Sequence, residues 1–252
     1  YGADPAIMQD IGMESKGLEF SEYVTKESLA QQGGYGLTLK GPQHDEAWLI
    51  FLDMVNNFMP TFEQKAEALW WFPLWRTWFG LNGLCKLPWN DIVPEDNKET
   101  PEPAKVVKHL QWYAEFFSAV TGVDASPDDL LKMSERVYNF QRLFTLRQGF
   151  GTREHDSIPY RAMGPVTKEE YESRRHRYDT QLKELSILDP VGKSTEEKLS
   201  ALRRYREDRY EKLKDAAYKR REWSLNGIPT IEKVKKLGIA FPDVLELISR
   251  YQ

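Results

Sequence analysis

Cys85 is the residue whose type and local sequence first indicate chemistry. It is the only cysteine of the chain, and it closes the segment Leu81-Asn82-Gly83-Leu84-Cys85. A glycine at this spacing predicts a turn in which main-chain N–H groups can surround a sulfur atom. We therefore interpret Cys85 as a candidate ligand of a metal or a metal cluster. The alternative is a buried structural thiol, which is the commoner state of a free cysteine.

His44 is the second candidate. It follows the rigid Gly41-Pro42 turn, and a helical pattern begins directly after it at Asp45. A histidine held at such a position can give or take a proton near neutral pH, so we interpret it as a candidate proton-transfer residue. The alternative is a capping or surface histidine. The remaining histidines have no metal-ligand spacing and are interpreted as structural or solvated: His109, His155 and His176.

The composition excludes several classes of protein. The chain has 252 residues, of which 40% are hydrophobic, and this is enough for a sizeable core. One cysteine can form neither an internal disulfide nor, alone, an iron–sulfur cluster. The formal charge of -4 argues against a general nucleic-acid-binding surface. No apolar run approaches the roughly 20 residues that span a bilayer, so we expect no transmembrane segment and a cytoplasmic protein.

Hydrophobic spacing predicts a mostly α-helical protein that must position these residues. The predicted helices cover residues 28–32, 45–58, 62–81, 106–121, 126–148, 230–237 and 242–251. We expect Gly33-Gly34 to end the first of them, and the second to bury a broad face. The tryptophan-rich 62–81 helix is apolar on nearly all sides and is expected to be buried. Residues 167–222 are dense in charge and predict two solvent-exposed helices broken at 189–192.

Several segments of the chain, taken in order, resemble one known family. They are Lys16-Gly17-Leu18-Glu19, the Gly-rich run that ends in His44, Gly83-Leu84-Cys85, Tyr138–Phe150, Arg153–Arg161 and Arg221–Thr230. Together they resemble the C-terminal portion of the tungsten-containing aldehyde ferredoxin oxidoreductase family. The resemblance implies the helical C-terminal domains of that family, with its N-terminal β domain absent from this chain. The start of the chain at Tyr1, without Met, fits the same expectation of a longer subunit.

The resemblance also implies a division into domains. We expect residues 1–124 to end the second helical domain, which binds the cofactor and the cluster. Residues 125–252 would then form the third helical domain, with a charged insertion at about 165–205.

The resemblance implies that the protein binds the cofactors of this family, a tungsten bis-pterin (tungstopterin) and a nearby 4Fe-4S cluster. Cys85 matches the fourth cluster ligand, and the other three cysteines belong to the upstream part of the same subunit. Asn82, Gly83 and Leu84 match the turn whose backbone approaches the pterin, although Gly80 stands where the family usually has a pterin-binding Asp. His44 matches the catalytic histidine. Aromatic side chains such as Trp48, Trp71 or Trp75 would form a hydrophobic wall, although aromatics at helical spacing are more often core.

The turn before His44 bears on the substrate. The family members that oxidise aldehydes usually have Gly-Ala-Cys-His after an Arg, whereas this chain has Lys40-Gly41-Pro42-Gln43-His44. The altered turn resembles the tungsten subunit of the ATP-independent benzoyl-CoA reductases, which reduce an aromatic acyl-CoA at low potential. Aldehyde oxidation to a carboxylic acid is the alternative activity, and a non-catalytic helical binding module is the alternative class.

The partners expected from the resemblance follow from the same chemistry. They are an iron–sulfur electron-transfer subunit or ferredoxin and a small-molecule substrate, either an aryl-CoA or an aldehyde. We also expect an oligomer and no nucleic-acid partner.

Overall fold

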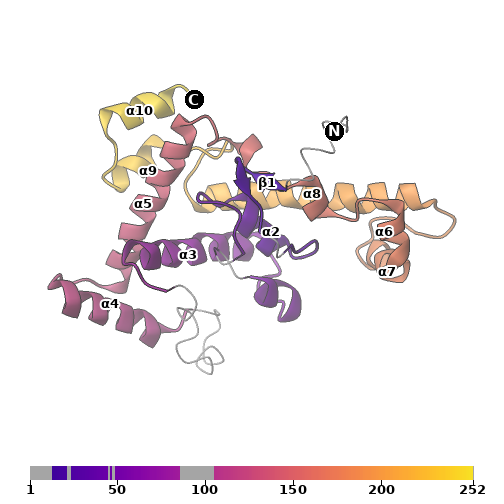
Figure 1. Cartoon of the computed structure of the whole chain (residues 1–252), viewed down its shortest axis with the longest axis horizontal. Helices are drawn as coiled ribbons and strands as arrows, with labels where there is room; N and C mark the ends of the chain where they lie inside the picture. Colours follow the sequence, from indigo (N-terminus) through magenta and orange to yellow (C-terminus); the bar gives the residue numbers. More distant parts are fainter. Residues whose placement is uncertain (1–12, 22–23, 45, 47–48, 86–104, 252) are drawn as a thin grey trace.

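The structure, a computed structural model, describes residues 13–21, 24–44, 46, 49–85 and 105–251 and is mostly helical (Figure 1), as the sequence predicts. Its helices are α2 (Leu29–Gly36), α3 (Phe62–Leu81), α4 (Val107–Thr121), α5 (Pro127–Arg147), α6 (Lys168–Ser173), α7 (Arg175–Glu184), α8 (Thr195–Arg220), α9 (Ile231–Lys236) and α10 (Pro242–Ser249). A two-stranded antiparallel hairpin precedes them, formed by β1 (Glu14–Ser15) and β2 (Leu18–Glu19). Within the described ranges, no helix combines the length and the apolar composition needed to cross a membrane.

Helix α3 lies at the centre of the fold, where it packs against α2, α5 and α8 (Figure 1). It begins with a capping box, in which Thr61 and Gln64 each bond the other's main-chain N–H. Trp75 and Trp78 are almost completely buried, with 0% and 3% of their surface exposed. The prediction of a buried helix over residues 62–81 is therefore confirmed.

Pro73 lies inside α3 and removes one main-chain hydrogen bond, because a proline nitrogen carries no hydrogen. The carbonyl left without its helical donor belongs to Leu69, four residues earlier. Arg221, directly after α8, donates from Nη2 to this carbonyl oxygen at 3.0 Å. A side chain distant in sequence thus satisfies a group that α3 cannot satisfy itself.

The glycines at 33–34 do not end the first helix, so that prediction is wrong: α2 continues through them to Gly36. A Cβ on the first of them would lie 2.6 Å from Leu69 Cδ1 and 2.9 Å from Leu213 Cδ2. A Cβ on Gly36 would overlap the hydroxyl of Tyr210. These glycines have a packing role, because they let α2 approach α3 and α8 closely.

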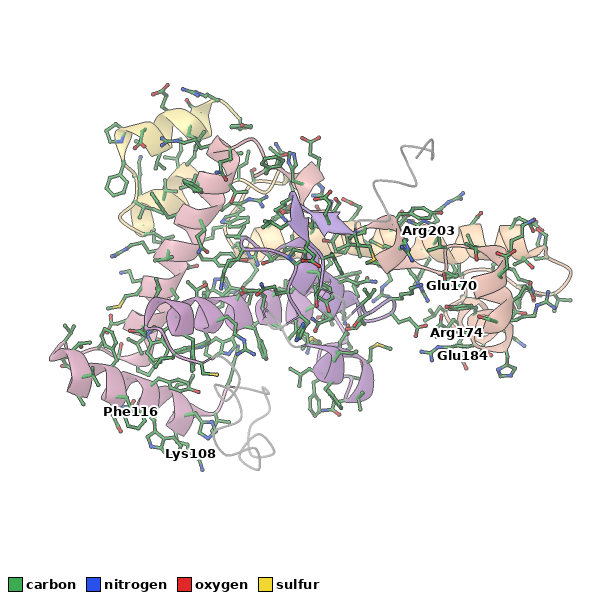
Figure 2. The ribbon with its side chains drawn as sticks, in the orientation of Figure 1. Lys108, Phe116, Glu170, Arg174, Glu184 and Arg203 are labelled. Atoms are coloured by element: carbon green, nitrogen blue, oxygen red, sulfur yellow. The ribbon has the colours of Figure 1, made fainter. Side chains whose placement is uncertain are left out.

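Two predictions of burial are also wrong. The predicted 45–58 helix is represented by a short π-helix, Phe51–Val55, and Phe51, Val55 and Phe58 are exposed. A π-turn changes the direction of successive side chains, so a pattern counted for an α-helix no longer marks one face. The hydrophobic spacing of residues 106–121 also predicts that Phe116 points inward, but on α4 this side chain is 67% exposed (Figure 2).

Helix α8 corrects the expectation of two solvent-exposed helices in the charged segment. Tyr210, Leu213, Ala217 and Tyr218 are each at most 2% exposed and form the face that packs on the core. The charged residues between them hid this face in the sequence. Long basic side chains can cover apolar surface with their stems, which is how Lys214 is buried on the same helix.

Helices α6 and α7 lie beside the N-terminal half of α8, away from α3 (Figure 1). Their Tyr171, Tyr178 and Leu182 form a small apolar cluster with Leu202 of α8. The main apolar cluster draws on residues from Phe20 to Trp223 and thus on both sides of residue 124. The division into domains 1–124 and 125–252 stays a prediction.

Candidate functional site

The turn that follows α3 is fixed by its own backbone. Gly83 has a φ of +66°, and Leu84 N–H donates to Phe79 O at 2.9 Å. The Asn82 side chain donates from Nδ2 to Trp78 O at 2.8 Å, which caps the last turn of the helix. We call residues 82–85 the Cys85 turn. These bonds set the direction in which the chain leaves the buried α3.

Cys85 ends this turn as a free, exposed thiol. The alternative interpretation of Cys85 as a buried structural cysteine is therefore wrong. Among the residues that the structure describes, no three side chains of His, Cys, Asp or Glu gather to hold a metal ion. A thiol is the donor that iron–sulfur clusters use, and a lone exposed one suits a cluster whose other ligands come from elsewhere.

His44 is held in an exposed turn between α2 and the π-helix. Its Nδ1 lies 3.0 Å from Ser21 Oγ, and which of the two donates depends on the tautomer. Its carbonyl accepts from Gln31 Nε2 at 3.2 Å, while Gln31 Oε1 accepts from Leu49 N–H at 2.7 Å. Ser21 N–H also donates to Pro42 O at 3.0 Å, which ties the turn to the β-hairpin segment.

The helix expected directly after His44 does not begin there. Glu46 and Leu49 are not helical, and the first described helical residue is Ile50. Instead, Glu46 is buried and pairs with Lys40 at 2.8 Å across the turn. This ion pair gives the unusual Lys40 a structural partner within the same turn.

The three aromatic residues expected to form a hydrophobic wall differ in where they lie. Trp75 belongs to the core, where its ring packs 5.8 Å from that of Trp71 and 5.6 Å from that of Tyr113. Trp71 is partly buried, with Lys105 Nζ over its ring at 4.7 Å. Trp48 lies outside the described residues. The aromatic cluster therefore packs mainly on itself.

A buried ion cluster that the sequence analysis did not identify lies near the end of α2, where Lys16 Nζ donates to Gly36 O at 2.5 Å. Arg142 on α5 binds Asp156 through two hydrogen bonds, of 2.8 and 2.7 Å. Lys16 Nζ lies 2.8 Å from the same carboxylate, and Tyr218 donates to it at 2.6 Å. We call these residues, with Tyr210, the Asp156 cluster.

The electrostatics of the Asp156 cluster follow from its burial. Both Asp156 and Arg142 have 0% exposed side chains. Burial alone would raise the pKa of the Asp156 carboxyl, but Arg142 and Lys16 hold it well below its ordinary value. Burial and the same carboxylate raise the pKa of Tyr218, so the hydroxyl stays protonated and donates.

The sequence contained one indication of the Asp156 cluster. Lys16, Arg142 and Asp156 fall in three of the segments that carry the family resemblance. Their joint burial could have been suspected from those motifs, although no periodicity or spacing brings them together.

The comparisons with known proteins agree with these segments. The family model described as "Aldehyde ferredoxin oxidoreductase, domains 2 & 3" matches residues 1–239. The chain therefore belongs to the aldehyde ferredoxin oxidoreductase family, and it carries the helical part of that fold.

Curated relatives are more distant and match shorter segments. A tungsten-containing aldehyde ferredoxin oxidoreductase of Pyrococcus horikoshii is 41% identical over 49 residues, which are 19% of this chain and 8% of the relative. One of Pyrococcus abyssi is 37% identical over 51 residues, covering 20% and 8%. One of Pyrococcus furiosus is 28% identical over 128 residues, covering 51% and 16%. The chain thus covers less than a fifth of the length of each of these relatives.

Proposed function

We propose that this chain is the C-terminal part of the catalytic subunit of a tungsten-pterin oxidoreductase. Membership of the family supports the class, and the curated relatives carry tungsten in their names. The single observation that carries the proposal is the exposed thiol of Cys85 at the end of a fixed turn. Cys85 would supply one ligand of a 4Fe-4S cluster, and the upstream part of the subunit would supply the other three.

The Cys85 turn also suits a cofactor that approaches the backbone. Asn82, Gly83 and Leu84 are all exposed, and Gly83 has no neighbouring heavy atom within 4 Å of the Cβ position. We assign these three residues to contact with the pterin through their main-chain groups. When bound, the tungsten pterin supplies two-electron transfer with the substrate.

His44 would hold or move the proton that accompanies this transfer. Its imidazole is exposed, and its Nδ1 lies 3.0 Å from Ser21 Oγ, a contact that orients the ring. The bond from Gln31 Nε2 to His44 O and the bond from Ser21 N–H to Pro42 O keep the turn from shifting when the ring changes protonation. Electrons would be exchanged with an iron–sulfur subunit or a ferredoxin.

For the substrate we favour an aromatic acyl-CoA, reduced to a cyclic diene with two electrons and two protons. The altered 40–43 turn supports this choice, because Lys40 is committed to Glu46 and the turn lacks the residues usual in aldehyde-oxidising members. Aldehyde oxidation to a carboxylic acid is the second candidate, because the curated relatives bear that name.

The experiment is metal analysis and turnover of the full subunit with its natural partners. We expect tungsten and iron in the purified protein, and turnover with benzoyl-CoA under a low-potential donor. Turnover with aldehydes alone would move the assignment to the second candidate. An active but metal-free complex would refute the proposed class and favour the non-catalytic helical module.

Two variants test the residue assignments. Cys85→Ser is expected to change the electron paramagnetic resonance signal of one cluster, and an unchanged signal would remove Cys85 from the ligand set. His44→Ala is expected to lower turnover about 100-fold or more while the metal content stays normal. His176→Ala is the matched control, because His176 is an exposed histidine on α7 with no assigned role.

A further inference from the structure

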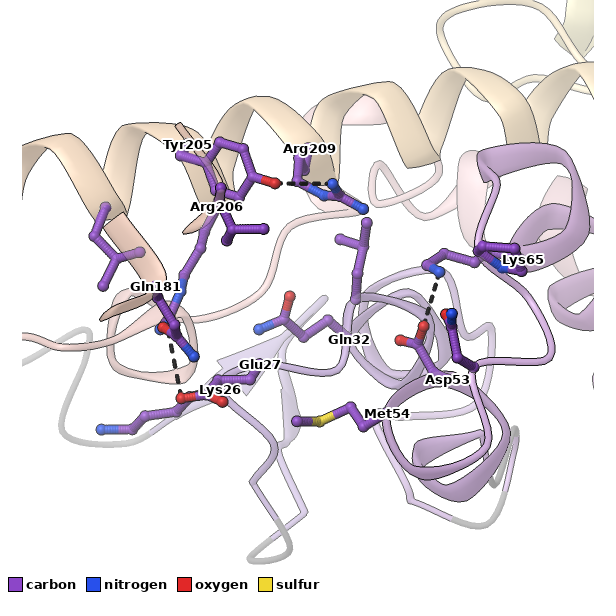
Figure 3. A pocket seen from close by; sticks show the side chains of 15 residues that line it. Lys26, Glu27, Gln32, Asp53, Met54, Lys65, Gln181, Tyr205, Arg206 and Arg209 are labelled. Carbon is purple, nitrogen blue, oxygen red and sulfur yellow. Dashed lines mark hydrogen bonds and ion pairs between the residues drawn. The ribbon is translucent and has the colours of Figure 1, made fainter. Parts of the chain in front are cut away.

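A cavity of about 280 Å³ lies where α7 and α8 face α2 and the π-helix (Figure 3). Its apolar lining includes Leu29 of α2, Met54 of the π-helix and Leu202 of α8. Polar side chains from the same elements point into it, among them Gln32 and Arg209 (Figure 3). The cavity therefore combines a small apolar wall with a larger set of polar and charged side chains, so a ligand that fits it needs a polar group as well as an apolar body.

The carboxylates that line the cavity are already committed. Asp53 pairs with Lys65 at 2.7 Å and also accepts from the Ser28 hydroxyl at 2.9 Å. Glu27 pairs with Arg177 outside the cavity and lies 3.6 Å from Arg206. These pairings leave neither carboxylate available to neutralise a further cation.

Arg206 is a buried cation with incomplete compensation. Its hydrogen-bond acceptors are neutral: Met163 O at 3.3 Å, Gly164 O and Gln181 Oε1 at 3.2 Å. Its carboxylate partner, Glu27, is shared with Arg177. Burial lowers the pKa of Arg206 in spite of Glu27. An anion in the cavity would improve the electrostatic surroundings of this guanidinium.

Among the cationic side chains that line the cavity, Arg209 is the one without a carboxylate partner in the part of the chain that the structure describes. Its guanidinium lies 5.3 Å from the ring of Phe62 and 5.5 Å from that of Tyr205, and Nη1 donates to Tyr205 Oη at 2.9 Å. No carboxylate of the described residues forms an ion pair with it. Two aromatic rings and a hydroxyl thus hold the guanidinium in place, with further N–H groups available to a ligand.

We propose that this cavity binds the oxyanion of a small organic anion on Arg209, with the apolar body of the ligand against Leu29, Met54 and Leu202. A guanidinium binds carboxylate and phosphate oxygens through paired hydrogen bonds, so a carboxylate and a phosphate monoester share the required chemistry. The site is separate from the Cys85 turn and from His44, and it does not depend on the proposed oxidoreductase activity.

Calorimetric titration of the full protein tests this site with three probes of similar size. Benzoate and phenyl phosphate carry the two forms of oxyanion, and benzamide is the uncharged counterpart. We expect saturable binding of at least one anion and none of benzamide. The preferred anion identifies the class of ligand. No saturable binding of either anion at millimolar concentration, or equal binding of benzamide, would overturn the proposal.

Arginine variants locate the binding. Arg209→Gln is expected to weaken binding of the anion about tenfold or more, because it removes a charge-assisted hydrogen bond. Arg204→Gln, an exposed position on the same helix, is the matched control and should leave the affinity unchanged. Equal affinity in the wild type and the Arg209→Gln variant would place the anion elsewhere, for example at the catalytic centre.

Chemical modification gives a readout that needs no variant. Phenylglyoxal reacts with accessible guanidinium groups, and mass spectrometry identifies the modified arginines. We expect the bound anion to protect Arg209 and to leave Arg204 as reactive as before. Loss of protection at Arg209 with retained binding would contradict the proposed contact.

Discussion

The Asp156 cluster and the Cys85 turn place reactive groups in opposite settings. In the cluster, Asp156 and Arg142 are completely buried, and Lys16 and Tyr218 complete the coordination of the carboxylate. In the turn, only main-chain and amide bonds fix the backbone, and the thiol of Cys85 is exposed. One region satisfies its charges entirely within this chain, while the other presents a single donor outward.

The difference indicates that the two regions have different roles, one in stability and the other in presenting a ligand. The Asp156 cluster joins the β-hairpin segment, α5 and α8, so it holds together the elements on which α3 rests. The Cys85 turn contributes little to that scaffold and depends on it for position. We therefore expect substitutions in the cluster to act on stability, and substitutions in the turn to act on the cofactor.

Asp156→Asn should have the largest effect on stability. The substitution leaves Arg142 and Lys16 buried without their shared carboxylate, and breaking a buried pair in this way costs about 3–5 kcal/mol. Denaturant unfolding of the full protein measures the loss. Asp124→Asn is the matched control at an exposed aspartate. Equal stability of the two variants would mean that the cluster does not support the fold.

The dependence of stability on pH, measured at acidic pH, tests whether the charge of Asp156 is responsible. The pKa of Asp156 is lower in the folded protein than in the unfolded chain, so its contribution is present above about pH 4. That contribution is lost as the pH falls further toward the folded pKa. We expect the difference in unfolding free energy between wild type and Asp156→Asn to shrink below about pH 4. A constant difference across that range would show that the Asp156 charge is not responsible.

Gly36→Ala should have the next largest effect. The added methyl group overlaps the Tyr210 hydroxyl, which donates to Asp156 O at 3.0 Å. Overpacking and the lost hydrogen bond together cost about 2–4 kcal/mol. Gly80→Ala is the control, because nothing lies within 4 Å of its Cβ position and it is expected to be neutral or slightly stabilising. Thermal unfolding measures both, and equal melting temperatures would contradict close packing of α2.

Cys85→Ser should have the smallest effect on stability, within about 0.5 kcal/mol, because its side chain is exposed. Its effect on iron content should nevertheless be large. Thermal unfolding and iron analysis of the same preparation separate the two quantities. A destabilisation as large as that of Asp156→Asn, in protein freed of its metals, would remove the contrast between the two regions.

The elements that could be predicted from the sequence are those whose signals are local. Thr61 caps the start of α3, Ser126 and Pro127 start α5, and Gly122, with a φ of +72°, follows the end of α4. The turn at Gly83 belongs to the same group, because its positive φ is a property of one residue.

The packing of α2 and the buried face of α8 could not be predicted, because both depend on residues that are distant in sequence. The glycines of α2 look like a helix stop until Leu213 and Tyr210 of α8 are placed beside them. The buried face of α8 is hidden by its charged residues until α3 covers it. For the candidate site, the sequence suggests Cys85 as a candidate ligand but does not show whether its thiol is buried.

The hydrogen bond from Arg221 to Leu69 has a consequence for the order of chain synthesis. The chain leaves the ribosome from its N-terminus, and 152 residues separate these two partners. The middle of α3, interrupted at Pro73, therefore acquires its last backbone partner only after the end of α8 has been translated. Because Cys85 is positioned by the end of that helix, we expect assembly of a metal cluster on it to follow the translation of α8.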